Sequence, residues 1–518
     1  MALLIVAGMA SLLLATRWGV GITPDAIVYV TSARNLADGY GLVLAVDGLA
    51  YTPVTHHAPF YPFLLGSLGV VGIAPVVIAR WLNTLLFAAN ILLVVLLGAV
   101  NSKQYSVNSE PDQADDRLPP TGHRSPIAIW LPLVGGLLLL PAPMLEVHAY
   151  ALTEPLFLLL LLAALWLLTA YLETAAPRYL LLTAVLLALA CLTRYAGLAF
   201  VLAAGLALLL WDAGPLRQRL GRALLLDAVA GLPLVLWLIR NQVAAGTGTS
   251  RSLVFHPLGP GHVRQAVDTV SSWLLLPLTL PGLVKMGLLA LLLAGGVGLA
   301  WRVYGRSWPP LLKLLSLFSL VYLLFLVISI SFVDANTPLD HRILAPIYLM
   351  GVVGGVGLLT AVYAHRLSSP FMRTIGALFL LLFLVGQGVQ TAGWLQQAYR
   401  DGLGFNQRVW RQSALLAEVR TLPAGVPIYS NAPSAVHFLI GRPVQALPRK
   451  MEATTQQSNP HYQAEMAALQ RQFQEETAVV VYLTVLAGAA APTEPELQEV
   501  LALHPQTRLP EGVLYVTR

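Results

Sequence analysis

The sequence GITPDAIVYVTSARN, residues 21–35, lies between an apolar opening block, residues 2–16, and a polar stretch that precedes the next apolar block. Its acid, Asp25, stands just outside the first hydrophobic segment, and a short amphipathic segment follows it. Carboxylates at membrane depth are costly and usually mark a functional site. The stretch therefore predicts a site at one membrane face, with the rest of the chain as its scaffold.

The composition predicts a membrane protein. Of the 518 residues, 57% are hydrophobic and 11% are charged, whereas a soluble protein carries about 25% charged residues. The apolar residues form blocks near the roughly 20 residues that cross a bilayer. The net charge of +6 therefore reflects loop topology and not a nucleic-acid partner. The single cysteine, Cys191, excludes an internal disulfide framework.

We expect about eleven membrane crossings, with residues 59–100 counted as one crossing preceded by a broken or interfacial lead-in at 59–72. The first block lacks the basic flank of a signal peptide, so we count it as a crossing. The expected apolar blocks are residues 2–16, 59–100, 127–140, 155–172, 179–192, 196–211, 223–239, 283–301, 311–332, 343–363 and 371–389.

The basic residues decide the orientation of these crossings. With the N-terminus inside, five successive inner loops carry Lys or Arg, which is the positive-inside pattern. Counting two crossings in residues 59–100 would invert that pattern. The inner residues are Lys103, Arg117, Arg124, Arg178, Arg217, Arg219, Arg222, Arg302, Arg306, Arg366 and Arg373. We therefore expect a multi-pass protein of the cell (plasma or inner) membrane.

The loops on the outer side hold most of the chemically interesting residues. The first of these loops is residues 17–58, and the others are residues 141–154, 193–195, 240–272 and 333–342. The inner loop at residues 101–125 is rich in Ser, Asp and Pro, and we expect a flexible cytoplasmic connector there.

The chain changes character near residue 393. Polar sequence with alternating strand and helix patterns replaces the apolar blocks, which predicts a small α/β domain. The strand patterns lie at residues 426–429, 478–483 and 512–516, and the helix patterns lie at 413–421 and 461–476. The fold class is thus an all-α polytopic domain, residues 1–392, followed by an extracytoplasmic α/β domain, residues 393–518.

Asp25 and Glu154 are the strongest catalytic candidates. Each is an acid at the outer end of an expected crossing, followed by apolar sequence. Each could also be an ordinary helix N-terminal residue, where an acid complements the helix dipole. Their shared sidedness favours a functional role.

Basic and imidazole groups gather on the same side as the two acids. Acids and cations at one membrane face suit a charged lipid headgroup, with cations for its phosphate and a carboxylate for proton abstraction. No His or Cys spacing indicates a zinc site, and His56 and His57 alone are a weak metal pair. The substrate-binding candidates are His56, His57, Arg194, Asp340, His341 and Arg342.

Six short motifs occur in a familiar order after Asp25. They are HHAPFYP at residues 56–62, TEPLF at 153–157, LTRYAG at 192–197, HRILAP at 341–346, and IYSN at 428–431 with GRP at 441–443. This order resembles the GT-C class of membrane glycosyltransferases. It is most similar to bacterial relatives of protein O-mannosyltransferases, lipid A aminoarabinose transferases and rhizobial lipopolysaccharide core transferases.

The resemblance implies a hexosyl- or pentosyltransferase that moves a sugar from a polyprenyl-phosphate donor to a glycan, lipid or protein acceptor at the extracytoplasmic face. It places the family's first-loop acid at Asp25, as general base or acceptor-orienting group, and its second-loop acid at Glu154. The family's basic phosphate ligand falls near His57, but Ala58 replaces a proline there, and Arg342 is the alternative.

Two questions stay open at the level of sequence. Some relatives use a divalent metal ion, which Asp25 and Glu154 would hold if one binds. A transporter or flippase of a lipid or polar solute is the alternative function, and a structural assembly protein is a third. Transporters usually show inverted repeats and charges within their spans. No such repeat is evident in this sequence, and the possible intramembrane charges, Lys285 and Asp227, can both be interpreted as residues near the ends of their spans.

Overall fold

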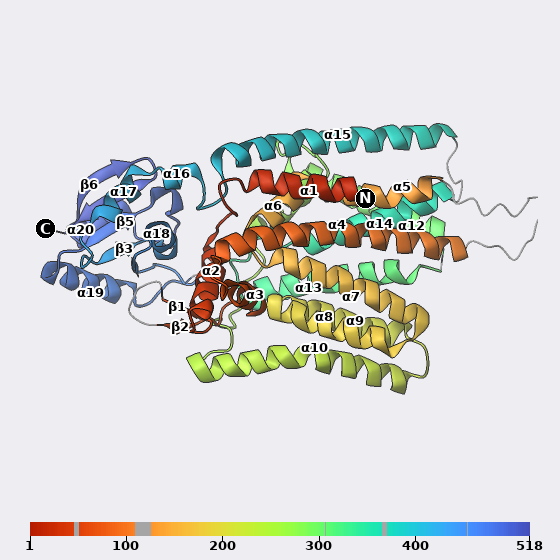
Figure 1. Ribbon diagram of the computed structural model, residues 1–518, viewed down its shortest axis with the longest axis horizontal. Helices are drawn as coiled ribbons and strands as arrows, with labels where there is room; N and C mark the ends of the chain where they lie inside the picture. The colour runs from red at the N-terminus through yellow and green to blue at the C-terminus, as the bar shows by residue number, and fades with distance from the viewer. Residues whose placement is uncertain (46–50, 109–125, 306, 365–369, 453, 518) are drawn as a thin grey trace, which may run out of the picture.

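A computed structural model describes residues 1–45, 51–108, 126–305, 307–364, 370–452 and 454–517 of the chain (Figure 1). A long bundle of helices forms one part of the molecule, and a smaller domain built around a sheet lies at one end of that bundle. The short helices α2 (Pro24–Ala37) and α3 (Phe60–Gly69) lie at the same end of the bundle, close to the smaller domain.

Seven helices in the described part of the chain are long and apolar enough to cross a membrane. The pair Leu131–Leu137 and Ala142–Ala149, bent by 57°, would make an eighth crossing. The seven are α4 (Pro75–Asn108), α7 (Glu154–Thr174), α10 (Leu216–Ala245), α12 (Gly282–Tyr304), α13 (Pro310–Phe332), α14 (Ala345–Ala364) and α15 (Pro370–Asp401). The chain is therefore a polytopic helical membrane protein, as predicted.

The count of eleven crossings is not confirmed and remains a prediction. The helices α1 (Ala2–Ala15), α8 (Pro177–Thr193) and α9 (Gly197–Trp211) lie where crossings are expected, but they have only 14, 17 and 15 residues. The bent pair belongs to α5 (Pro126–Leu137) and α6 (Ala142–Ala149). Length alone does not decide whether these shorter segments cross.

The break expected in residues 59–100 is confirmed, because α3 ends at Gly69 and α4 begins at Pro75. The connector expected at residues 101–125 begins later than predicted. Residues 101–108 continue α4, and the remainder of the expected connector, residues 109–125, lies outside the described residues. Between the spans lie α11 (Pro260–Trp273) and a short antiparallel hairpin of β1 (Val43–Leu44) and β2 (Thr52–Pro53).

The tail forms the predicted α/β domain. Its five-stranded sheet has the order β4-β3-β5-β7-β6, with β4, β3 and β5 parallel to one another and β7 antiparallel to β5 and β6. The strands are β3 (Ile428–Ser430), β4 (Gln445–Ala446), β5 (Val479–Tyr482), β6 (His504–Leu509) and β7 (Gly512–Val516). The helices are α16 (Arg408–Arg411), α17 (Ala414–Thr421), α18 (Pro433–Ile440), α19 (Tyr462–Glu475), α20 (Glu494–Val500) and the 3₁₀ turn η1 (Thr484–Leu486).

The tail domain is docked on the bundle through a continuous apolar core. One buried cluster runs from the bundle into α17, α18 and one face of the sheet, where Leu415, Val419 and Val436 belong to it. A second cluster fills the space between the other face and α19 and α20. The helix α15 also continues past residue 393, where we expect the boundary, to Asp401.

Candidate active site

Main-chain hydrogen bonds join three segments at the end of the bundle that faces the tail domain. The amide of Gly21 donates to the carbonyl of Ala149 over 2.8 Å, and the amide of Ala151 donates back to Gly21 over 2.9 Å. On the other side, the amide of Phe405 donates to the carbonyl of Ile22 over 2.9 Å. The residues just before Asp25 are thus fixed between the turn leading to Glu154 and the segment leading to the tail domain.

Two glycines permit this close approach. A Cβ atom on Gly21 would lie 2.4 Å from the ring of Tyr150, and one on Gly404 would lie 2.1 Å from the carbonyl oxygen of Ile22. Gly404 also has φ of +55°, in the left-handed region that glycine adopts most readily. Because glycine has no Cβ atom, the three segments can approach closely enough at these two points to form the main-chain hydrogen bonds.

Both candidate acids lie in the first turn of a helix. Thr23 caps α2 by accepting a hydrogen bond from the amide of Ala26 over 3.2 Å, Pro24 follows, and Asp25 is in the first turn. Glu154 is the first residue of α7. The helix-start interpretation is therefore correct for both acids, and the site is built on it, because the dipole of each helix favours a negative charge there.

Two arginines bind these acids in one network. Arg342 donates from Nη2 to Asp25 Oδ2 and from Nε to Glu154 Oε1, each over 3.0 Å. Arg194 contacts the same Glu154 oxygen with its Nη1 at 2.5 Å and donates to Thr153 Oγ1 over 3.1 Å. Burial alone would lower the pKa of Arg342, but the carboxylates of Glu154 and Asp25 outweigh it and raise that pKa.

The histidines stand beside this network as neutral groups. Nδ1 of His57 shares a hydrogen bond of 3.1 Å with the hydroxyl of Tyr29. Burial lowers the pKa of His57 to about 4, although the nearby carboxylate of Asp25 opposes the shift. Arg251 contacts His56 at two points. Its Nη1 donates to the main-chain carbonyl of His56, and its Nη2 lies 3.0 Å from the ring Nε2 of His56.

Asp340 and His341 have supporting positions. Oδ1 of Asp340 accepts the amides of Arg342 and Ile343 over 3.0 and 3.1 Å, so it fixes the turn that presents Arg342. His341 faces Trp273 instead of the acids, and its Nδ1 accepts the indole N–H of Trp273 over 2.9 Å. The structure thus brings Asp25, Glu154, Arg194 and Arg342 together, keeps His56 and His57 nearby, and turns His341 toward α11.

Sequence reasoning missed the side chains that hold the Glu154 turn. Nδ2 of Asn83 on α4 donates to the carbonyls of Tyr150 and His148 over 2.5 and 3.3 Å. Asn90, also on α4, lies 3.0 Å from His148 Nε2 and donates to the carbonyl of Pro155 over 3.1 Å. Both asparagines are fully buried. Two amides seven residues apart share one face of a helix, and that spacing in an apolar block was the available signal.

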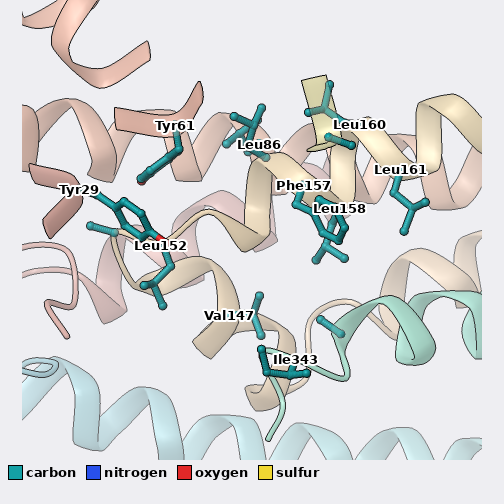
Figure 2. Packing of buried hydrophobic residues seen from close by; sticks show 14 of the residues in the cluster. Tyr29, Tyr61, Leu86, Val147, Leu152, Phe157, Leu158, Leu160, Leu161 and Ile343 are labelled. Atoms are coloured by element: carbon teal, nitrogen blue, oxygen red, sulfur yellow. The ribbon is translucent and has the colours of Figure 1, made fainter. Parts of the chain in front are cut away.

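Aromatic side chains support the same turn from α2 and α3. The rings of Tyr29 and Tyr61 meet edge to face with their centroids 5.7 Å apart, and Leu152 lies close to them (Figure 2). The hydroxyl of Tyr61 donates to Oδ1 of Asn83 over 3.2 Å. The backbone before Glu154 is therefore enclosed by α2, α3 and α4.

A cavity of about 600 Å³ opens beside Arg342. Its lining comes from the residues before Asp25, from α6, from the turn before α14, from the segment between α15 and α16, and from the tail domain. Arg342 belongs both to the network and to the lining of the cavity.

Among the described residues, no three His, Cys, Asp or Glu side chains gather closely enough to hold a metal ion. The two acids that would bind the metal share the guanidinium of Arg342. We therefore assign no step to a metal.

Comparisons with solved structures identify the fold. ArnT from Cupriavidus metallidurans, bound to undecaprenyl phosphate, superposes with a TM-score of 0.56 at 13% identity over 100% of this chain and 98% of that chain. Archaeal AglB from Archaeoglobus fulgidus, in complex with an inhibitory peptide and a dolichol-phosphate, gives 0.51 at 12% identity over 92% of this chain and 69% of that chain. Arabinofuranosyltransferase AftD from Mycobacteria gives 0.50 at 14% identity, covering 100% and 41%.

No protein-family model matches the chain, and no curated protein sequence matches it. At sequence identities of 12–14%, these similarities show the fold alone. The chain has the fold of the GT-C membrane glycosyltransferases, with a small sheet domain at its C-terminal end.

Proposed function

We propose that this protein is a glycosyltransferase that moves a sugar from a polyprenyl-phosphate donor to an acceptor hydroxyl at the extracytoplasmic membrane face. The observation that carries the proposal is the network in which Arg342 binds both Asp25 and Glu154 beside a cavity. The similar structures of ArnT and AglB contain undecaprenyl phosphate and a dolichol-phosphate, and this supports a polyprenyl-phosphate donor here.

The reaction makes a bond between the acceptor oxygen and the anomeric carbon and breaks the bond between that carbon and the phosphate oxygen. Polyprenyl phosphate leaves as an anion and needs neutralisation more than a proton. A guanidinium grips phosphate oxygens with two N–H groups, so Arg342 and Arg194 fit this role. His57, which is neutral at pH 7 because burial lowers its pKa to about 4, contributes a hydrogen bond and no positive charge.

The acceptor proton requires a base, and Asp25 fits this role better than Glu154. The side chain of Asp25 is 41% exposed, whereas that of Glu154 is 2% exposed and is held by two arginines. Arg342 contacts one carboxylate oxygen of Asp25, so the other oxygen can receive a proton. Glu154 positions the two arginines.

The proposed sidedness places the site and the tail domain outside the cell membrane. It rests on the basic residues of alternate loops. Reporter fusions at Asp116 and Gly402 should therefore give opposite sidedness. Equal sidedness at the two positions would refute this orientation.

A transporter or flippase is not favoured. The charged network lies at one end of the bundle, at the first turns of α2 and α7, whereas transporters place their binding sites near the bilayer midplane. The similar structures are also transferases.

The Asp25→Asn variant tests the proposed function. It keeps the size of the side chain and removes the base, and general-base catalysis contributes about 10²–10⁴-fold. We expect sugar transfer to fall by that factor while the membrane level of the protein stays unchanged. Mass spectrometry of envelope glycolipids and glycans, from a deletion strain carrying each variant, measures the product.

Asp38→Asn is the matched control, because Asp38 caps the other end of α2 and is exposed. It should transfer sugar at the wild-type rate. Near wild-type transfer by Asp25→Asn would show that Asp25 is only a helix-terminal residue.

A further inference from the structure

The cavity beside Arg342 has walls from both parts of the molecule. Arg342 and Asp340 belong to the bundle, whereas Leu486 in η1 and Glu511 in the turn between β6 and β7 belong to the tail domain. A volume of about 600 Å³ is in the range of small-ligand sites, about 300–1,000 Å³. The tail domain therefore completes a ligand-sized space that opens directly on the proposed reaction centre.

The cavity wall combines apolar and aromatic surface with carboxylates. Phe405, Trp410 and Leu486 supply the apolar part, and the rings of Phe405 and Trp410 lie 5.9 Å apart. Glu146, Asp340 and Glu511 supply the carboxylates. One oxygen of Glu511 accepts the hydroxyl of Ser413 over 2.7 Å, and a carboxylate has further acceptor positions for hydroxyl donors.

Charge is distributed unequally between the two sides of Arg342. Within the described lining of the cavity, Arg342 is the single basic side chain, against three acids. The other basic groups lie on the side of Glu154 and His56, where Arg194 pairs with Glu154, and Arg251 contacts His56 and pairs with Asp334. On that side each of the two arginines is matched by one carboxylate. In the cavity, three carboxylates surround one arginine that Asp25 and Glu154 already bind, so like charges repel a phosphate most strongly there.

We propose that the cavity is the acceptor site and that it binds a neutral sugar unit of the acceptor through its hydroxyl groups and its apolar face. This inference rests on the proposed function and narrows it. The acceptor is a carbohydrate whose recognised end carries no phosphate, and the tail domain selects it through Leu486 and Glu511. The donor phosphate binds on the opposite side of Arg342, near Arg194.

The order of events in the site follows from this arrangement. Pro24, next to Asp25, lines the cavity, and so does Arg342, which binds Asp25. In the proposed complex the sugar hydroxyl therefore enters from the cavity and reaches Asp25, while the donor carbon lies beyond Arg342. The new bond joins the acceptor oxygen to the anomeric carbon, the hydroxyl proton passes to Asp25, and the phosphate leaves with the bonding electron pair. No further reactant is needed.

The test uses the full chain in lipid nanodiscs with small probes. The probes are methyl glycosides of common hexoses and pentoses, and the 6-phosphates of the same hexoses, followed by saturation-transfer NMR. We expect at least one methyl glycoside to receive saturation from the wild-type protein and the corresponding phosphate to receive less. The Leu486→Trp variant fills the cavity and should weaken this binding about tenfold, which corresponds to about 1.4 kcal/mol.

Val500→Trp is the matched control. Val500 is an apolar residue of the same domain, in α20, and its exposure of 36% is close to the 39% of Leu486. Its glycoside signal should equal that of the wild type. The proposal is overturned if no glycoside binds, if the two tryptophan variants behave alike, or if the phosphates bind more tightly than the glycosides.

A second measurement separates this inference from the proposed function. Undecaprenyl phosphate should raise the unfolding temperature of the wild type and of Leu486→Trp equally, because its site lies away from Leu486. If undecaprenyl phosphate stabilises both proteins but glycosides fail to bind, the acceptor assignment alone is wrong. If undecaprenyl phosphate stabilises neither protein, the proposed donor is wrong.

Discussion

Asp25 and Glu154 each stand in the first turn of a helix and each bind Arg342 over 3.0 Å, yet their surroundings differ. Glu154 is 2% exposed and binds a second arginine, Arg194, with the same oxygen. The side chain of Asp25 is 41% exposed, and among the described residues it forms an ion pair with Arg342 only. In a deeply buried network an acid mainly compensates other charges, whereas a half-exposed acid can exchange a proton with an incoming ligand.

The comparison predicts its largest effect for the loss of Glu154. Glu154→Leu leaves two largely buried guanidinium groups without their shared carboxylate, and breaking a buried ion pair costs about 3–5 kcal/mol. Asp25→Asn removes the ion pair between Asp25 and Arg342, in which Asp25 is partly exposed to solvent. Exposed ion pairs contribute about 1 kcal/mol or less to the free energy of unfolding. Thermal unfolding of the purified variants measures both losses, and equal losses would contradict the distinction.

An intermediate effect is expected for Arg342→Lys. Arg342 binds its two acids with Nε and Nη2, and in the proposed complex its guanidinium also binds the donor phosphate, whereas a lysine has one nitrogen for all these partners. Losing one charged hydrogen bond to the donor phosphate costs about 1.5–3 kcal/mol, so the KM for the donor should rise about 10- to 100-fold.

Arg471→Lys on the exposed face of α19 is the control for that substitution. Its donor KM should match that of the wild type. An unchanged donor KM in Arg342→Lys would remove Arg342 from the phosphate site.

The smallest expected effect is the contribution of His57 to the pH dependence of stability. Its folded-state pKa of about 4 lies below the unfolded value of about 6.5, so the unfolded chain binds more protons between these two values. Stability therefore falls as the pH drops from about 6.5 toward 4. The unfolding temperature of His57→Gln should decline less between pH 7 and pH 5 than that of the wild type, and equal declines would mean that His57 is not buried as a neutral group.

Much of the fold was predictable because its signals are local. Apolar blocks of bilayer length predicted α4, α7 and α10, and alternating patterns in the tail predicted β3, β5 and β7. The edge strands β4 and β6 escaped prediction. The two-residue β4 pairs with β3 through Gln445 and Ala446, and β6 runs HPQTRL with five polar or proline residues, so neither has an apolar pattern to detect.

The candidate site was predictable in its residues but not in its pairings. Asp25, Glu154, Arg194 and Arg342 were each expected on one membrane face, and they do meet. Their exposed fractions, which separate the roles of the two acids, depend on packing between helices distant in the sequence. Arg251 illustrates the limit, because a lone arginine in a loop gives no sign that it contacts His56, 195 residues earlier.

The main-chain connection at Ile22 has a consequence for the energetics of the two substrates. Ile22 accepts the amide of Phe405 on one side, while its neighbour Gly21 exchanges hydrogen bonds with the turn that leads to Glu154 on the other. A molecule that contacts Phe405 and shifts this backbone also shifts the start of α2, which carries Asp25. If a bound acceptor changes the position of Asp25 and thereby the affinity of the site for the donor, a bound donor changes the affinity for the acceptor by the same factor, because such coupling is reciprocal. Donor and acceptor then bind as thermodynamically linked ligands, and the affinity of each depends on the presence of the other.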